Sequence, residues 1–258
     1  MPLTVISPQS VNRICCLIIG KYGMGKTSLL RTILGQQYID GAWQQVVEIP
    51  DGQKVCVLSA ESGLLAVRDL IVAGLVEGYE IANIMEFKEA YQMLATNQAM
   101  KDRYRWVFID SLTEISARCD EAMREKYPDK SKTFARWDDY YASVGGLVKG
   151  FRDLLAYSVA FTALETIEKD DSNRRFPAPD VIGRGLKEKL PSYFDEVFYM
   201  QVESDAEGDH RVLYTQPVRE FPAKDRSGKL DIIEPANLLH IHNKILEIEQ
   251  GEVTHAAA

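Results

Sequence analysis

A glycine-rich turn with a lysine and a threonine stands near the start of the chain, in residues 20–28. It follows the pattern of a glycine, four residues and then Gly-Lys-Thr, in which backbone N–H groups close around a phosphate chain. The glycines Gly20, Gly23 and Gly25 suit a backbone that approaches an anion closely and adopts dihedral angles that a Cβ forbids. We therefore expect this turn to bind the phosphates of a nucleotide.

The positions of this turn have distinct expected roles. Lys26 would reach the β- and γ-phosphates, and the hydroxyl of Thr27 would be a ligand of Mg²⁺. The dipole of a following helix would favour the negative charge of the phosphates. The residues expected to contact the nucleotide are Gly20, Tyr22, Gly23, Met24, Gly25, Lys26, Thr27 and Ser28.

The flanking sequence predicts the elements that must hold this turn. The segment 13–19 is an apolar run, which is typical of a strand buried on both faces. The segment 27–34 has helical spacing and ends at Gly35. The turn could instead be a plain connection between a strand and a helix, but the order of strand, turn and helix favours phosphate binding.

Two later apolar strands end in polar side chains. Asp110 follows the large apolar residues 106–109, and an aspartate at the end of a central strand can hold the water shell of Mg²⁺ beside the phosphates. It could equally cap the following helix. Thr162 lies near the end of the segment 158–165, where a polar group could sense the γ-phosphate, although threonine is common in strands.

A third carboxylate, Glu61, lies just beyond the apolar segment 54–58. Ligands of open α/β sheets bind at the carboxyl ends of strands. Since Asp110 is followed by Ser111 and not by a second acid, Glu61 is the candidate base that orients and deprotonates the attacking water. The alternative is an acid that complements the dipole of the next helix. The Asp-Gly pair at 51–52 further predicts a β-hairpin between 46–49 and 54–58.

The second part of the chain has a different character. Its composition changes over residues 169–191: residues 169–179 are polar and contain prolines, which predicts a mobile loop, and residues 183–189 continue the basic character. Segments 194–202 and 211–215 are typical of paired strands, and a terminal helix is expected over 235–249. The alternation of strands and helices predicts an α/β fold, a mostly parallel sheet flanked by helices with a C-terminal β-hairpin extension. We expect one domain over 1–258, with a nucleotide-binding core over 1–168 and the loop, hairpin and terminal helix over 169–258.

Composition restricts the classes of protein. The chain has 258 residues, of which 46% are hydrophobic and 26% charged, as in an ordinary globular domain. A net charge of −8 argues against a surface that binds polyanions everywhere, so a nucleic-acid site must be a local basic patch. The four cysteines show no Cys-x-x-Cys spacing and are expected to be buried, reduced thiols. With no apolar run of bilayer length, we expect a cytoplasmic protein without a membrane partner.

Four segments together resemble a known family, namely 20–28, 60–63, 108–111 and 223–230. They resemble phage-encoded nucleotide-binding proteins of the RecA-like core type, some of which act as ATP-dependent single-strand annealing proteins in phage recombination. The resemblance implies a RecA-like P-loop ATPase that uses ATP and Mg²⁺, and it supports Glu61 as the residue that activates water. It also implies a Lys-x-Arg finger pair that reaches the neighbouring subunit's γ-phosphate. Lys224 and Arg226 match that spacing, so a homo-oligomer, either a ring or a filament, is expected.

Basic residues with an interleaved aromatic residue follow the Thr162 strand. Such a group can track the phosphates of a single strand and stack a base, so single-stranded DNA is the expected partner. The residues concerned are Arg174, Arg175, Phe176, Arg184, Lys187 and Lys189. A solvated basic loop is the alternative. A single-strand binding protein is a further candidate partner.

Two other functional classes remain open from the sequence. The first is a nucleotide-dependent switch that binds a protein partner with little turnover. The second is a small-molecule kinase, which is ranked lower because no arginine-rich lid is apparent. No motif for base recognition distinguishes ATP from GTP.

Overall fold

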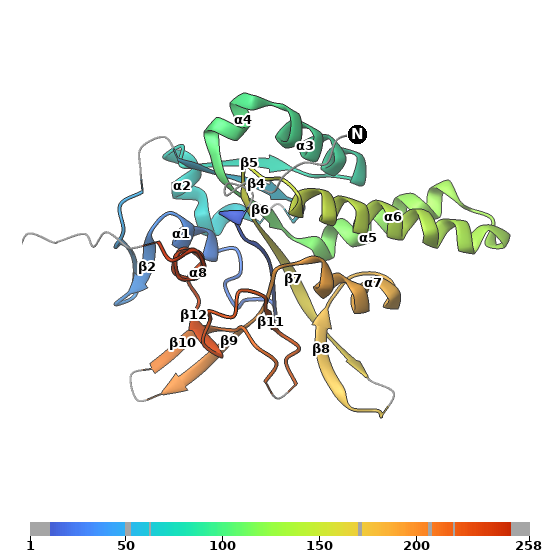
Figure 1. Ribbon diagram of the computed structural model, residues 1–258. Coiled ribbons are helices and arrows are strands. Elements are labelled where there is room, and N and C mark those ends of the chain that lie inside the picture. The colour runs from blue at the N-terminus through green and yellow to red at the C-terminus, as the bar shows by residue number, and fades with distance from the viewer. Residues whose placement is uncertain are drawn as a thin grey trace, which may run out of the picture.

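The computed structural model describes residues 11–49, 53–61, 63–169, 172–205, 208–218 and 220–248, which form a mixed β-sheet with helices on both faces (Figure 1). The strands are β1 (Cys15–Gly20), β2 (Gln36–Ile39), β3 (Ala42–Gln45), β4 (Lys54–Ser59), β5 (Val76–Glu80), β6 (Tyr104–Asp110), β7 (Ser158–Lys169), β8 (Arg175–Pro179), β9 (Glu196–Asp205), β10 (Gly208–Tyr214), β11 (Lys224–Asp225) and β12 (Ile233–Pro235). The helices are α1 (Leu29–Ile33), α2 (Arg68–Val72), α3 (Ile84–Thr96), α4 (Gln98–Arg103), α5 (Leu112–Lys126), α6 (Thr133–Arg152), α7 (Arg184–Lys189) and α8 (Leu238–Leu246).

The strand order along the main sheet is β12-β10-β9-β1-β7-β6-β4-β5. Every adjacent pair from β9 to β5 is parallel, and β10 and β12 follow in antiparallel pairing. This arrangement confirms the mostly parallel α/β sheet expected from the sequence. The expected C-terminal hairpin is β9–β10, and it continues the sheet because β9 pairs directly with β1.

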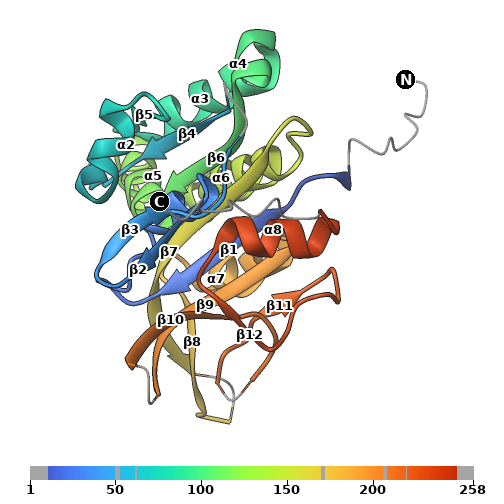
Figure 2. The same ribbon diagram turned by 90° about the vertical axis from the view of Figure 1, so that its left-hand side faces the viewer.

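β1 is buried on both faces, and its alternate side chains enter two separate cores. Cys15, Leu17 and Ile19 belong to the core that also contains buried residues of α3, α5 and α6. Cys16 and Ile18 face the opposite core, which is closed by α1, α2 and α8. Figure 2 shows α8 in front of the sheet on this side. A strand covered in this way needs apolar side chains at every position, which accounts for the uninterrupted run. All four cysteines are buried and free.

The predicted β-hairpin between residues 46–49 and 54–58, with Asp51-Gly52 as its turn, is wrong. β4 is filled on both sides by parallel neighbours, β5 and β6, and has no edge left for residues 46–49. Residues 50–52 themselves lie outside the described part of the chain. The hairpin forms instead between β2 and β3 through the other Asp-Gly pair, Asp40 and Gly41, whose φ angles are 51° and 82°. Positive φ at both central residues is what a two-residue hairpin turn requires.

The basic segment after β7 is a hairpin and not the loop expected from sequence. β7 extends over 12 residues to Lys169, and β8 returns beside it in antiparallel pairing. The prolines at 177 and 179 had indicated a loop, but they are tolerated because β8 is an edge strand. This hairpin projects from the body at the bottom of Figure 1, and residues 170 and 171 at its turn lie outside the described part.

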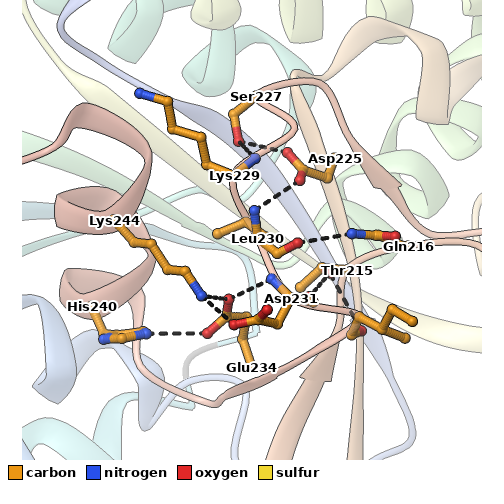
Figure 3. A network of polar contacts seen from close by, with 11 residues as sticks. Thr215, Gln216, Asp225, Ser227, Lys229, Leu230, Asp231, Glu234, His240 and Lys244 are labelled. Atoms are coloured by element: carbon orange, nitrogen blue, oxygen red, sulfur yellow. Dashed lines mark hydrogen bonds and ion pairs between the residues drawn. The ribbon is translucent and has the colours of Figure 1, made fainter.

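A buried glutamate attaches α8 to the end of the sheet (Figure 3). Glu234 of β12 is 3% exposed and accepts hydrogen bonds from the Lys244 ammonium at 2.5 Å and the Asp231 amide at 2.8 Å. His240 Nε2 lies 3.1 Å from its other oxygen. Leu238 and Ile241 of α8 are buried against the core that contains α1. The contact places the last helix against the helix that follows the phosphate turn.

Among the described residues, no helix has the length and apolar content needed to cross a bilayer.

A second buried carboxylate, Glu196, lies at the start of β9 and is 2% exposed. β11 places Asp225 directly opposite it. Burial, together with the carboxylate of Asp225, raises the pKa of Glu196 to about 8. The folded protein therefore holds a proton on Glu196 over a range of pH in which an unfolded chain would have lost it.

We expect this proton to make stability depend on pH, and Glu196→Gln to remove that dependence. Between the ordinary pKa of glutamate and about pH 8 the folded state binds one more proton than the unfolded state. The free energy of unfolding should therefore fall as pH rises through this window, by up to about 1.4 kcal/mol per pH unit from this group. Denaturant titrations across the window test this, with the exposed Glu121→Gln as control. Parallel pH profiles of wild type and Glu196→Gln would contradict it.

Candidate functional site

The turn between β1 and α1 has the backbone that its glycines predict. Gly23 and Gly25 have φ angles of 76° and 92°, in the region that side chains with a Cβ rarely adopt. At Gly20 a Cβ would lie 3.0 Å from the carbonyl oxygen of Met200 on β9, so the close approach of the two strands also requires glycine. Strand packing therefore requires glycine at the start of the turn, and positive φ angles favour glycine within it.

Lys26 lies across this turn and is 9% exposed. Its ammonium donates hydrogen bonds to the carbonyl oxygens of Gly20 and Lys21, each at 2.8 Å. The cation is therefore held where the turn closes, at the position from which it can meet a phosphate. Thr27 and Ser28 follow at the entry to α1, and Tyr22 is 88% exposed at the outer edge of the turn.

Three carboxylates interact electrostatically with the Lys26 ammonium. Burial lowers the pKa of Lys26, while Asp110, Glu61 and Glu165 act in the opposite direction and favour its charged form. The site therefore combines one buried cation with several anionic groups. This distribution of charge suits a phosphate chain that arrives together with a divalent cation.

Asp110 connects the phosphate turn with two strands of the sheet. It is 3% exposed and accepts a hydrogen bond from the Thr27 hydroxyl at 2.7 Å and from the Thr162 hydroxyl at 2.5 Å. The parallel register brings these residues to one edge, since Ile18 pairs with Thr162 and Ile109 pairs with Phe161. The peptide bond between Asp110 and Ser111, where β6 ends and α5 begins, is cis.

The pair of Thr27 and Asp110 fits the ligands that Mg²⁺ prefers. Both are oxygen donors, one a hydroxyl and one a carboxylate, and their oxygens already lie 2.7 Å apart. Mg²⁺ is bound in such sites through one or two protein oxygens together with water and phosphate oxygens. The structure therefore brings the two predicted metal ligands together, and with them the predicted sensor Thr162.

Glu61 lies beside this group, one strand further along the sheet. Ser59 of β4 pairs with Asp110 of β6, so the chain beyond β4 runs next to the start of α5. There the Ser111 hydroxyl donates a hydrogen bond to Glu61 Oε1. Glu61 is exposed, so water can reach its carboxylate. Among the described residues, this hydrogen bond with Ser111 holds one carboxylate oxygen of Glu61 beside the start of α5.

Sequence reasoning missed a residue that contacts the turn from β10. Arg211 Nε donates a hydrogen bond to the carbonyl oxygen of Met24 at 2.9 Å, across 187 positions of sequence. A charged residue in the middle of β10 carries no local pattern that marks such a contact. Only the strand order, with β9 and β10 beside β1, brings it to the turn.

The predicted finger residues Lys224 and Arg226 lie away from this site. β11 pairs with the start of β9, where Glu196 is in register with Cys16 of β1, so the pair lies at the opposite end of the strands from Gly20. Lys224 donates a hydrogen bond to the carbonyl oxygen of Phe194, and Arg226 forms an ion pair with Asp195 at 2.8 Å.

The turn that holds these two residues is well defined. The side chain of Asp225 accepts hydrogen bonds from the amides of Gly228 and Leu230, each at 3.0 Å. Figure 3 shows the contact with Leu230. The finger pair is thus presented on a fixed turn at the far end of the sheet, and it does not reach the phosphate turn of its own chain.

The residues predicted to bind DNA are divided between two elements. Arg174 and Arg175 are exposed near the tip of the β7–β8 hairpin, and Phe176 follows them, half-buried, in register with Glu168. On α7, Lys187 forms an ion pair with Glu168 at 2.6 Å and Arg184 forms one with Glu188 at 2.7 Å. Lys189, also on α7, is exposed. The structure thus places Arg174 and Arg175 near a projecting tip and the other three cations on α7.

One comparison with known proteins identifies a family. Residues 12–227 match a family described as the AAA domain, a range that includes the phosphate turn, Glu61, Asp110, Thr162 and the finger pair. No curated protein matches the sequence. Since the matched range covers most of the chain, the protein belongs to the AAA domain family and is a nucleotide-binding ATPase domain of the P-loop type.

Proposed function

We propose that this protein is a Mg²⁺-dependent ATPase whose hydrolysis cycle controls its assembly on single-stranded DNA for strand annealing or recombination. The observation that supports the ATPase most directly is the contact of Asp110 with Thr27 and Thr162. It joins the metal ligands and the sensing position beside Lys26, with Glu61 one strand away. The proposed role in DNA metabolism rests on the resemblance to RecA-like phage proteins and on the basic hairpin.

The residues of the site have different roles in phosphoryl transfer. The Lys26 ammonium exchanges its two carbonyl partners for phosphate oxygens, and amides of the glycine turn bind the rest of the chain. Thr27 and Asp110 would hold Mg²⁺, which would supply neutralisation of the phosphate charge. Glu61 accepts the proton of the attacking water, with the Ser111 hydroxyl holding one of its oxygens so that the other faces the water.

The β7–β8 hairpin is the surface best suited to a nucleic acid. In a chain with a net charge of −8, contact with phosphates requires a local group of cations, and this tip has one. The same strand, β7, contains Thr162 at its inner part and ends at Lys169 near the tip. One continuous strand therefore links the nucleotide site to the proposed DNA contact.

Lys224 and Arg226 act in this proposal on a neighbouring copy. Arg226 is largely exposed, with its ion pair to Asp195 at the surface, so its guanidinium can be released at small cost when a phosphate is offered. The active form is then a homo-oligomer.

A second function, a nucleotide-dependent module for a protein partner, is favoured by one observation. The ion pairs of Arg184 and Lys187 with their acidic neighbours reduce the positive charge that α7 adds to the hairpin. ATP turnover measured with and without single-stranded DNA separates the two functions, because only the DNA-directed ATPase should be stimulated.

The first prediction from this proposed function concerns Lys26. Lys26→Ala should reduce ATP hydrolysis to background, since the turn loses the cation that meets the β- and γ-phosphates. The fold should persist, as judged by circular dichroism, because the strands on either side are held by the two cores. Lys88→Ala, an exposed change on α3, is the control. Turnover equal to that of the control would refute the site.

The second prediction separates binding from chemistry. Glu61→Gln should leave the KM for ATP unchanged and reduce kcat by about 10² to 10⁴, the range for loss of a general base. Glu89→Gln, on the exposed face of α3, is the matched control. Equal loss of nucleotide binding and turnover would assign Glu61 a structural role.

The third prediction addresses DNA. Replacing Arg174 and Arg175 together by alanine should weaken single-strand binding and make its dependence on salt shallower, by about 1.4 units in the log–log slope when each arginine contacts one phosphate. Arg105→Ala, an exposed arginine at the other end of the sheet, is the control. A slope that stays at the wild-type value would place the DNA contact elsewhere.

A further inference from the structure

We infer that Arg211 binds the α-phosphate and ribose end of the nucleotide in cis, so that the β9–β10 hairpin forms the nucleoside side of the site. This inference rests on the proposed nucleotide site and deepens it, because it states in which direction the nucleotide lies across the sheet.

The acidic residues indicate on which side of β1 the γ-phosphate binds. Asp110 on β6 and Glu61 beyond β4 lie on the side of β1 toward β7, β6 and β4. Metal ions in these sites bridge the β- and γ-phosphates, and the attacking water meets the γ-phosphate. The γ-phosphate therefore lies toward β6 and β4. Since the nucleotide is a linear chain of groups, its α-phosphate and ribose extend across β1 in the other direction, toward β9 and β10.

Arg211 lies on that side at the level of the phosphate turn. Leu213 of β10 is in register with Met200 of β9, and the carbonyl oxygen of Met200 is the atom that a Cβ at Gly20 would meet. Arg211 comes two residues before Leu213 and so projects from the same face of the sheet, beyond the end of β1. Leu213 packs in the core that contains Leu29 of α1. Arg211 therefore lies on the face of the sheet from which the helix after the turn starts.

The guanidinium is already fixed against the turn through one edge. Its Nε donates to Met24, and a Cβ at Gly25 would come within 3.1 Å of Nε and 3.6 Å of Cζ, so the group lies directly on the glycine. Within the described residues, the two Nη groups have no hydrogen-bond acceptor, and the side chain is exposed. An arginine whose Nε is held by the backbone presents its remaining donors in a fixed direction, which suits a phosphate oxygen.

The same contact gives Gly25 a second reason to be glycine. Its φ of 92° already disfavours a side chain, and a Cβ would in addition displace the guanidinium from the turn. A backbone shaped to receive an arginine beside the phosphates is more than a support for the hairpin, because an exposed surface contact of this kind contributes little to stability by itself.

The test compares three ligands on the full chain by titration calorimetry with Mg²⁺ present. They are a non-hydrolysable ATP analogue, ADP and pyrophosphate, which lacks the α-phosphate ester and the nucleoside. Arg211→Ala should weaken the ATP analogue and ADP by the same factor, about 10- to 100-fold for a lost charge-assisted hydrogen bond, and leave pyrophosphate unchanged. Steady-state hydrolysis should show a raised KM with kcat retained. Arg211→Lys should restore binding in part, and Arg105→Ala should match wild type.

Two results would overturn the inference. If Arg211→Ala weakened pyrophosphate as much as the nucleotides, the residue would only support the turn. If no ligand were weakened, it would make no contact. A wild-type protein that bound none of the three ligands would refute the proposed function itself, and the inference would fall with it. The variant and the wild type thus report on the two claims separately.

Discussion

The burial of one carboxylate, that of Asp110, constrains the rest of the site. An aspartate that is 3% exposed loses most of its hydration, and burying a charge is costly unless hydrogen bonds and opposite charge replace the water. Two hydroxyls and the nearby Lys26 ammonium supply that replacement. They come from the turn after β1 and from β7, so the charge is tolerated only when β1, β7 and β6 are in register. The arrangement that suits a metal–phosphate complex is therefore also a condition on how the sheet assembles.

Much of this arrangement follows from local sequence. Local sequence predicts the buried strands, because a strand buried on both faces needs apolar side chains throughout. These strands contain the apolar run before Gly20, the apolar residues before Asp110 and the first of the paired segments after residue 194. Once these strands are parallel, their carboxyl ends lie at one edge, and Thr27, Asp110 and Thr162 meet there without further assumption. The core of the site could be predicted for this reason.

The predictions that were wrong or missed have a common physical cause, because the partner of a strand or side chain depends on the whole sheet and not on the local sequence. Asp40-Gly41 and Asp51-Gly52 are the same local signal, yet only the first lies between two strands with free edges. The residues after Lys169 contain prolines that usually indicate a loop, but an edge position needs no ladder hydrogen bond from them. Likewise, the contact of Arg211 with Met24 depends on β9 and β10 joining the sheet beside β1, and the sequence around either residue does not indicate it.

The position of the finger pair sets a geometric condition on any assembly. The phosphate turn follows the last residue of β1, whereas Lys224 and Arg226 lie beside the strand starts, where Cys16 is level with Glu196. If these cations act on a phosphate, they must meet the turn of another copy, and the two surfaces in contact are then different parts of the chain. A two-fold dimer uses the same patch on both partners, so that patch would have to extend from the finger pair to the phosphate turn at the other end of the strands. A head-to-tail contact needs no such extended patch, and it closes into a ring or continues as a filament according to the rotation between copies. Arg211 would then bind the nucleotide from within the chain, while the finger pair would approach from the neighbour, so that each nucleotide would be enclosed by two copies.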